Sequence, residues 1–384
     1  MEVVITMIGS HTTDGLRSDE RHARGSAMPV FPASPAYYLP RPDRLYRQLI
    51  ARRRSAALDR ATIDTILAAY GWQSQDAAQA PAGAGRSDSV IVPTAGGTKM
   101  LKRYKATVDP AAIVHEHSIL RHLARLDVPA PRVNVALNGA TLIQQGAACY
   151  AVFDVLEGYF QYHQYCLLPA QKQRYITASG TALGTLHSTL KDFMPDGQHP
   201  HGFTSRSGER VREIGWFIET LDRCRREVPA AADADRLEQR LLSLDRQLSA
   251  AALPRLIIHG DYGPYNLFFK PNAPIVILDF ELARLDWRLT DLATALPSFA
   301  RSRLGFHVRH MRAFLDGYRT RCAIDHAELA LLPLVWQFLT LRRVVVLWQR
   351  YGSTGAQTWF DQARRKENLA RWIADHQTTL VRWL

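Results

Sequence analysis

Cysteine is scarce in this chain, and the few cysteines follow no recognisable spacing. The 384 residues contain four, Cys149, Cys166, Cys224 and Cys322. They form neither the close pairs of a zinc site nor the dense framework of a small disulfide-rich domain. Free thiols suit a reducing compartment, so we expect a cytoplasmic protein.

Long apolar runs are absent too. No stretch of the sequence approaches the ~20 consecutive apolar residues that span a membrane. The first eight residues are apolar, but they include Glu2 and lack the basic region of a signal peptide. We therefore expect no association with a membrane.

Acidic residues are outnumbered by basic ones, and the formal net charge is +12. The excess is almost wholly arginine, and it is spread along the chain instead of being clustered with aromatic residues. Proteins that bind nucleic acid usually concentrate their basic residues on one motif or face. We therefore expect a solvated, arginine-rich surface and no nucleic-acid partner.

The composition is otherwise that of an ordinary globular protein, with 47% hydrophobic and 22% charged residues. A chain of 384 residues is long enough for one large core or for two lobes. No pattern in the sequence predicts an oligomeric state.

Residues 1–57 show no helical or strand periodicity and contain several prolines. We interpret them as an N-terminal extension that is partly disordered, and we leave open whether the chain starts at Met1 or at Met28. Regular structure is predicted to begin at Asp59, a good N-cap ahead of the apolar helical stripe in residues 63–70.

Residues 58–155 alternate short apolar runs with turn signals, which predicts a small lobe of strands around one helix. The expected elements are strands at 90–92 and 100–104, a helix after Asp109-Pro110, a hairpin of 133–137 with 141–144, and a strand at 150–153. The hairpin turns are assigned to Ala95-Gly96-Gly97 and to Asn138-Gly139. Residues 156–384 are predicted to form a larger, mostly helical lobe, which is interrupted by hairpins at 256–281.

The most informative stretch is residues 256–281, where polar residues stand at the ends of apolar runs. His259 and Asp261 follow the first run, and Asn266 opens the second. Asp279 ends the third run, eighteen residues after Asp261. Polar groups at strand ends are held by the core and still reach a cleft. Two carboxylates and a carboxamide at this spacing fit a phosphoryl-transfer site, with a base and two ligands for Mg²⁺.

Aspartate and asparagine also favour turns, so each of these residues taken alone would fit an ordinary β-hairpin. The joint occurrence of His-Gly-Asp, an asparagine five residues after the aspartate, and a second aspartate after an apolar run is harder to explain in that way. The combination therefore favours the phosphoryl-transfer site.

The segment resembles the aminoglycoside phosphotransferase and choline kinase superfamily. That resemblance implies an α+β, bilobal fold like that of protein kinases. The N-lobe, residues 58–155, would contain a small antiparallel sheet with one main helix and bind the nucleotide, and the C-lobe, residues 156–384, would be mostly helical.

The resemblance also assigns roles to individual residues. It implies that Asp261 is the catalytic base and that Asn266 and Asp279 hold the metal. Three further residues match structural positions of the superfamily: His259 before the base, His187 in a Leu-His pair, and Asp291, which would brace the catalytic loop.

The loop of residues 82–89 is rich in small residues and precedes a predicted strand. Backbone amides at Gly83, Gly85 and Ser87 can approach phosphates, because no large side chain intervenes. A flexible connector would have the same composition, so that alternative stays open.

Lys102 matches the superfamily's phosphate-binding lysine, and Lys99 and Lys105 are competitors for that role. Glu116 falls on the apolar face of the predicted helix, where a carboxylate is costly unless it is paired. We therefore predict an ion pair between Lys102 and Glu116, with a solvent-exposed Glu116 as the alternative. The resemblance also implies that the link between the lobes, at Asp154 and Val155, hydrogen-bonds the adenine through its backbone.

These residues predict a kinase that uses ATP and Mg²⁺ to phosphorylate a hydroxyl group of a small metabolite or antibiotic. The alternatives are a non-catalytic nucleotide-binding scaffold and an atypical protein kinase. A protein kinase carries lysine at the position of Gly263 and a long activation segment, whereas only eleven residues separate Asp279 from Asp291. Residues 206–246 carry nine acidic residues and nine arginines, which argues weakly against a polycationic acceptor such as an aminoglycoside.

Overall fold

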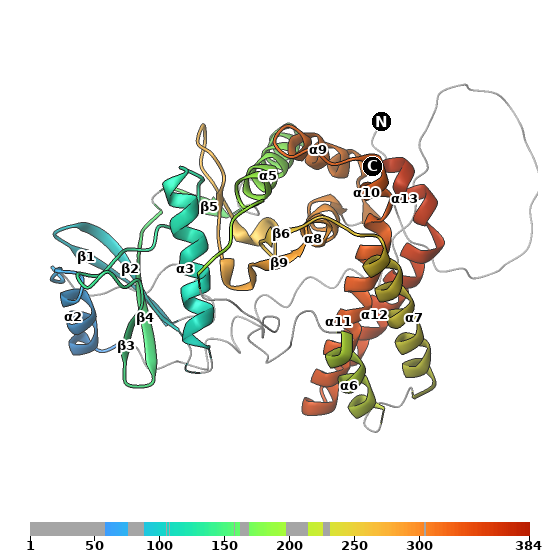
Figure 1. Cartoon of the computed structure of the whole chain (residues 1–384), viewed down its shortest axis with the longest axis horizontal. Coiled ribbons are helices and arrows are strands. Elements are labelled where there is room, and N and C mark those ends of the chain that lie inside the picture. The colour runs from blue at the N-terminus through green and yellow to red at the C-terminus, as the bar shows by residue number, and fades with distance from the viewer. Residues whose placement is uncertain are drawn as a thin grey trace, which may run out of the picture.

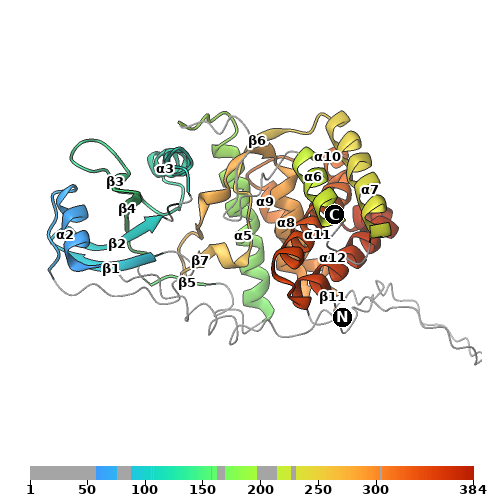
Figure 2. The same ribbon diagram turned by 90° about the horizontal axis from the view of Figure 1, so that it is seen from below.

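The computed structural model describes residues 58–75, 88–104, 106, 108–156, 158–161, 169–196, 214–225, 231–302 and 305–384. A small lobe with an antiparallel sheet lies beside a larger helical lobe, as Figure 1 and Figure 2 show. This is the bilobal α+β architecture that the sequence predicts. The extension 1–57, the loop with Gly83, Gly85 and Ser87, and Lys105 lie outside the described residues.

The sheet of the small lobe has four antiparallel strands in the order β1-β2-β4-β3. Their bounds are Asp88–Thr94 for β1, Gly97–Tyr104 for β2, Ile143–Gln145 for β3 and Ala148–Asp154 for β4. The β1–β2 hairpin turns at residues 95 and 96, as predicted.

The second predicted hairpin, 133–137 with 141–144, is wrong. The turn at Gly139 forms, since its N–H donates to the carbonyl of Ala136, but the flanking residues do not pair as strands. The Leu137 N–H instead donates to the carbonyl of Ala69, which draws this loop onto the C-terminal end of the helix Arg60–Ala68, α2. The real hairpin joins β3 to β4 at Gly146, whose φ of +61° suits glycine in a tight turn.

A helix covers each face of this sheet, and the alternation of side chains along β2 explains why. Leu101 packs in one core with Ile63 and Ile66 of α2 (Arg60–Ala68). Tyr104 packs in the other core with residues of α3 (Pro110–Arg125). Both helices begin at the predicted caps: Asp59 accepts from the Thr62 N–H at 2.7 Å and Asp109 from the Ala111 N–H at 2.9 Å.

The larger lobe is built of helices around one core. They are α5 (Pro169–Thr189), α6 (Ile214–Cys224), α7 (Ala231–Ala250), α8 (Leu289–Ala300), α9 (Val308–Arg319), α10 (His326–Ala330), α11 (Leu332–Thr354), α12 (Gln357–Asp375) and α13 (Gln377–Trp383). Four large side chains of α11, those of Trp336, Phe338, Leu347 and Trp348, are buried in this core. None of the helices in the described ranges is long and apolar enough to cross a bilayer.

Residues 256–281, which contain the candidate catalytic and metal-binding residues, form short strands between the small lobe and the helices (Figure 2). The strand β6 (Arg255–Ile258) pairs with β9 (Arg284–Trp287), and β7 (Leu267–Phe269) lies between β5 (Phe160–Gln161) and β8 (Val276–Ile277). Two 3₁₀ turns, η2 (Pro264–Asn266) and η3 (Phe280–Leu282), complete the segment. A further small pair, β10 (Arg301–Ser302) with β11 (Gly305–Phe306), follows α8.

Glycines set the close approach of α5 to α9. A Cβ atom on Gly180 would overlap the carbonyl of Phe314, and one on Gly317 would overlap the carbonyl of Thr177. The two backbones therefore touch, and any side chain at these positions would push the helices apart.

We expect Gly317→Ala to destabilise the fold by about 2 kcal/mol or more, because the added methyl group has no space at this crossing. The matched control is Gly215→Ala in α6, where a Cβ atom meets nothing within 4 Å. That substitution should leave stability unchanged or raise it by up to about 1 kcal/mol, because alanine favours helix. Urea denaturation of both variants checks the prediction, and equal stabilities would contradict it.

Candidate active site

The ring of His259 ties the candidate catalytic loop to the strand that leads to Asp279. Its Nε2–H donates to the carbonyl of Leu278 at 2.7 Å, and its Nδ1 accepts from the Asp261 N–H at 3.2 Å. Both ring nitrogens are therefore used, and the side chain is fully buried. The contacts fit the structural role implied for His259 and leave it no part in proton transfer.

Asp291, in the first turn of α8, binds the backbone of the same loop. Its carboxylate accepts from the N–H groups of His259 and Gly260, both at 2.8 Å, and from His187 Nε2 at 3.1 Å. Burial alone would raise the pKa of Asp291, but the hydrogen bond and charge of His187 and the contacts with His259 outweigh it and lower the pKa. The group is thus an anion that fixes two successive backbone amides.

Gly260 allows the loop to turn at this point. Its φ of +81° lies in the left-handed region, and a Cβ atom there would overlap the carbonyl of Leu282 in η3. Both the conformation and the space require glycine. The loop therefore crosses directly over η3, the turn that follows Asp279.

Asp261 and Asn266 are in direct contact. The Asn266 Nδ2 donates to the Asp261 carbonyl at 2.9 Å and to its Oδ2 at 3.1 Å. Because the amide nitrogen is engaged in this way, the amide oxygen of Asn266 is the atom available to a cation.

The pKa of Asp261 is raised. The side chain is exposed, yet the protein atoms gathered around it desolvate the carboxylate, and the charges of Asp279 and Asp291 add to this effect. The neighbouring His259 and the hydrogen bond from Asn266 oppose it without cancelling it. A carboxylate with a raised pKa is a better proton acceptor than an ordinary one.

Asp279 lies two residues after the end of β8. The Leu278 N–H donates to the Asn266 carbonyl at 2.8 Å, so the two candidate ligands lie at adjoining ends of the paired strands β7 and β8. Asp279 adopts φ +63° and ψ 65°, a left-handed conformation that aspartate and asparagine tolerate better than most residues.

One carboxylate and one amide oxygen are hard ligands of the kind that Mg²⁺ and Ca²⁺ prefer. Within the described part of the chain, no group of three His, Cys, Asp or Glu side chains could hold a metal by itself. A cation at Asp279 and Asn266 would therefore need further oxygen ligands from water or from another molecule, and nucleotide phosphates supply such oxygens.

The predicted Lys102–Glu116 ion pair is present, with Lys102 Nζ 3.5 Å from Glu116 Oε1. Both side chains are largely buried, at 15% and 7% exposure. Lys99 is on the opposite face of β2, where its Nζ lies 2.7 Å from Asp154 Oδ1 and 4.7 Å from the ring centroid of Trp72. The strand register therefore separates the two lysines, and only Lys102 faces α3.

Tyr104 belongs to the same face and was missed in the sequence. Its hydroxyl lies 3.0 Å from His117 Nε2 and 3.4 Å from Glu116 Oε2. The pKa of Tyr104 is raised by burial first, then by Glu116, and also by the charges of Glu281 and Asp279. Tyr104 therefore belongs to the Lys102–Glu116 cluster and lies within electrostatic range of Glu281 and Asp279. The alternation along β2 would have revealed it, since Tyr104 is two residues from Lys102.

Asp154 ends β4 at the start of the link between the lobes. Its carboxylate is engaged by Lys99 and by Asn134 Nδ2, the latter at 3.1 Å. Those bonds fix the chain just before Val155 and leave the side chain of Asp154 turned to the small lobe. The adenine-binding role of the backbone here stays a prediction.

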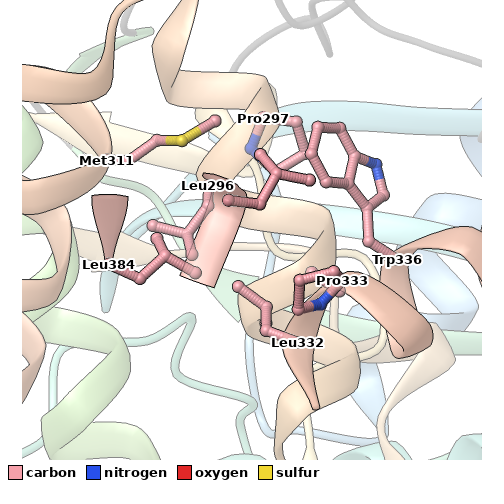
Figure 3. A pocket seen from close by; sticks show the side chains of 9 residues that line it. Leu296, Pro297, Met311, Leu332, Pro333, Trp336 and Leu384 are labelled. Carbon is pink, nitrogen blue, oxygen red and sulfur yellow. The ribbon is translucent and has the colours of Figure 1, made fainter. Parts of the chain in front are cut away.

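A small apolar cavity lies elsewhere, among α8, α9, α11 and the C-terminal residue (Figure 3). Its walls include Leu296, Pro297, Met311, Leu332, Pro333, Trp336 and Leu384. A cavity volume of about 10 Å³ leaves room for one water molecule at most. This cavity is a packing gap of the helical core and not a binding site.

The sequence model of the family described as Phosphotransferase enzyme family matches residues 76–332 of the chain. The homoserine kinase of Acidiphilium cryptum is 27% identical over 253 residues, which are 65% of this chain and 73% of the relative. The homoserine kinase of Rhodospirillum rubrum is 28% identical over 261 residues, which are 67% of this chain and 75% of the relative.

Solved structures share the fold at low sequence identity. Amicoumacin kinase hAmiN, in complex with AMP-PNP, Ca²⁺ and Ami, has a TM-score of 0.62 at 17% identity, over 86% of this chain and 96% of that one. A choline/ethanolamine kinase family protein from Mesorhizobium loti has a TM-score of 0.55 at 14% identity, over 88% and 99%. The predicted kinase-like fold is thereby confirmed.

If Lys102 and Glu116 act as one unit on a nucleotide, Lys102→Ala, Glu116→Ala and the double variant should lose similar affinity for ATP. We expect about tenfold in each case, because residues that act together are not additive. Lys99→Ala is the control, and it should bind ATP within about threefold of wild type. Calorimetric titration with an ATP analogue measures all four. Additive losses, or a Lys99 variant as weak as the Lys102 variant, would contradict the assignment.

Proposed function

The chain belongs to the phosphotransferase enzyme family, and we propose that it moves the γ-phosphate of ATP to a hydroxyl group of a small molecule with Asp261 as the base. The observation that carries the proposal is the grouping of Asp261, Asn266 and Asp279 on one loop and its neighbouring strand. Phosphoryl transfer depends mainly on positioning and on charge stabilisation, and this grouping supplies both.

Asp261 would orient the acceptor hydroxyl and take its proton as the new bond to phosphorus forms. Its raised pKa supports this role, because a base works best when its pKa lies nearer the operating pH. The bonds from Asn266 and the loop anchored by Asp291 restrict the rotamers of the carboxylate, so it meets the hydroxyl in a defined orientation.

Asp279 and Asn266 would hold the divalent ion, and we propose Mg²⁺ for that position. When bound, the ion would neutralise charge on the β- and γ-phosphate oxygens. Lys102, kept in place by Glu116, would bind the phosphates from the small lobe. Gly83, Gly85 and Ser87, and the backbone at Asp154 and Val155, complete the proposed nucleotide site.

Homoserine is the first acceptor to test, because homoserine kinases are among the relatives most similar to this chain. Homoserine carries a primary hydroxyl, which Asp261 could deprotonate, and it has no net charge at neutral pH. The equal numbers of acidic residues and arginines in 206–246 favour such an acceptor over a polycation.

The two alternatives are less well supported. A scaffold is expected to have lost part of the site, whereas Lys102, Asp261, Asn266 and Asp279 are all present. Between Asp279 and Asp291 the fully described chain consists of η3, β9 and the start of α8, which leaves no room for a peptide-docking activation segment. Incubation with γ-labelled ATP and homoserine, choline, ethanolamine, aminoglycosides or bulk protein distinguishes these functions.

Asp261→Asn should lower turnover by about a thousandfold or more, because the amide cannot accept the hydroxyl proton. Affinity for ATP should stay within about threefold, since Asp261 faces the acceptor. Asp64→Asn, an exposed residue of α2, is the matched control and should be fully active. Steady-state kinetics with an established acceptor provide the measurement, and a variant with most of its turnover would remove Asp261 from the mechanism.

Asp279→Asn should weaken Mg²⁺-dependent ATP binding by about tenfold and turnover by more, because the ion loses its anionic ligand. Asparagine is preferable to alanine here, since it tolerates the left-handed backbone and separates the loss of charge from backbone strain. Titration of activity against Mg²⁺ concentration tests this. An unchanged Mg²⁺ requirement and unchanged ATP affinity would count against the site.

A further inference from the structure

A cavity of about 470 Å³ lies among three helices of the larger lobe, α7, α11 and α12. Both overall views show these helices on the side of that lobe away from the small lobe (Figure 1, Figure 2). None of the described residues that line the cavity belongs to the candidate active site. The volume is sufficient for a small organic molecule.

Arginines dominate the charge of this cavity. Four of them line it against two carboxylates, those of Glu367 and Asp375, so the formal charge of the lining is +2. Arg364 and Arg371 of α12 are exposed, and Arg240 of α7 is partly buried. A concave surface with this excess of positive charge attracts anions.

Arg240 is oriented by a buried amide and not by a carboxylate. Its Nη2–H donates to Gln337 Oε1 at 2.8 Å. Gln337 is only 3% exposed, and its Nε2–H donates to the Ala370 carbonyl at 3.1 Å. This second bond determines that the oxygen of the amide, and not its nitrogen, faces Arg240. The guanidinium is therefore held where α7, α11 and α12 meet, and its charge is not neutralised there.

Two further arginines of the cavity also lack a carboxylate partner. Arg371 donates to Oδ1 of Asn368, which lies one turn earlier in α12 and is again a neutral group. Arg364 forms no hydrogen bond or ion pair within the described part of the chain. Arg225, just after α6, shows the contrast, because it pairs with three carboxylates. Three guanidinium charges of the cavity thus remain uncompensated.

We propose that this cavity binds a small organic phosphate monoester. A phosphate monoester carries close to two negative charges at neutral pH and has three strong acceptor oxygens. It therefore matches both the charge of the lining and the three uncompensated arginines, whose planar forks suit phosphate oxygens. Leu237 and Leu341 in the wall provide apolar surface for the organic part of the molecule. The proposal does not depend on Asp261 being the base.

Three probes with the same ring test the chemistry of the ligand: phenyl phosphate, benzoate and benzyl alcohol. Calorimetric titration of the full chain in a buffer without Mg²⁺ should show saturable binding of phenyl phosphate. Benzoate, with one charge and two oxygens, should bind about tenfold more weakly, and benzyl alcohol should not bind. Lack of saturable binding of phenyl phosphate would overturn the proposal, as would benzoate or benzyl alcohol binding equally well.

Two substitutions at exposed positions of α12 test the arginines. Arg364→Gln removes a guanidinium that has no protein partner, so affinity for phenyl phosphate should fall by about tenfold. Asn368→Asp is nearly isosteric and gives Arg371 a carboxylate partner, so it should lower the affinity by a similar factor without changing the shape of the cavity. Unchanged affinity in both variants would refute the site.

Matched controls separate this cavity from the general charge of the chain and from the candidate active site. Arg246→Gln and Gln247→Glu make the same changes of charge at exposed positions of α7 outside the cavity, and they should keep the affinity within about twofold. Losses as large as those of the α12 variants would show unspecific attraction and refute a built site. Lys102→Ala should also leave the affinity unchanged. A loss in Lys102→Ala together with an unaffected Arg364→Gln would place phenyl phosphate in the candidate active site and overturn the proposal.

Discussion

The structure depends on one buried carboxylate, that of Asp291. A fully buried anion is costly unless several donors surround it, and here two successive backbone amides and one histidine do so. Because the amides belong to His259 and Gly260, the same bonds fix the start of the candidate catalytic loop. Removing the carboxylate would leave the two loop amides without hydrogen-bond partners. The left-handed turn at Gly260, which lies against η3 and precedes Asp261, would then lose its anchor.

The two lobes are coupled through α3 and the turn that follows Asp279. His115 of α3 reaches the Ala283 carbonyl at 3.2 Å, and Tyr104, beside Glu116, lies within electrostatic range of Asp279 and Glu281 in the same turn. The buried His117 has its pKa lowered to about 3 by desolvation and by the nearby Lys102, so it stays neutral and serves Tyr104 and Thr141 by hydrogen bonding. Groups from both lobes thus meet at one place, where phosphates and a divalent ion would be held together.

The sequence predicted those features that arise from local chemistry. The caps at Asp59 and Asp109 and the turn near Gly96 follow from side-chain oxygens and glycine, so they were assigned correctly. Asn138-Gly139 carries an equally good turn signal, but the contact of Leu137 with α2 decided the path of the chain. The place of Tyr318 could not be predicted, because nothing in its local sequence reveals that α9 brings it beside His187, more than a hundred residues earlier in the chain.

The Lys102–Glu116 pair links the apolar face of α3 to the register of β2. A carboxylate on the apolar face of α3 is unfavourable unless a cation approaches it, and the register of β2 places Lys102 there while turning Lys99 toward α2. The same burial that makes the pair necessary also shields it from water, so its geometry is held before any ligand arrives. In the proposed site, preorganisation of this kind would lower the reorganisation needed to bind phosphate charge, so residues that contact no acceptor would still support the transfer.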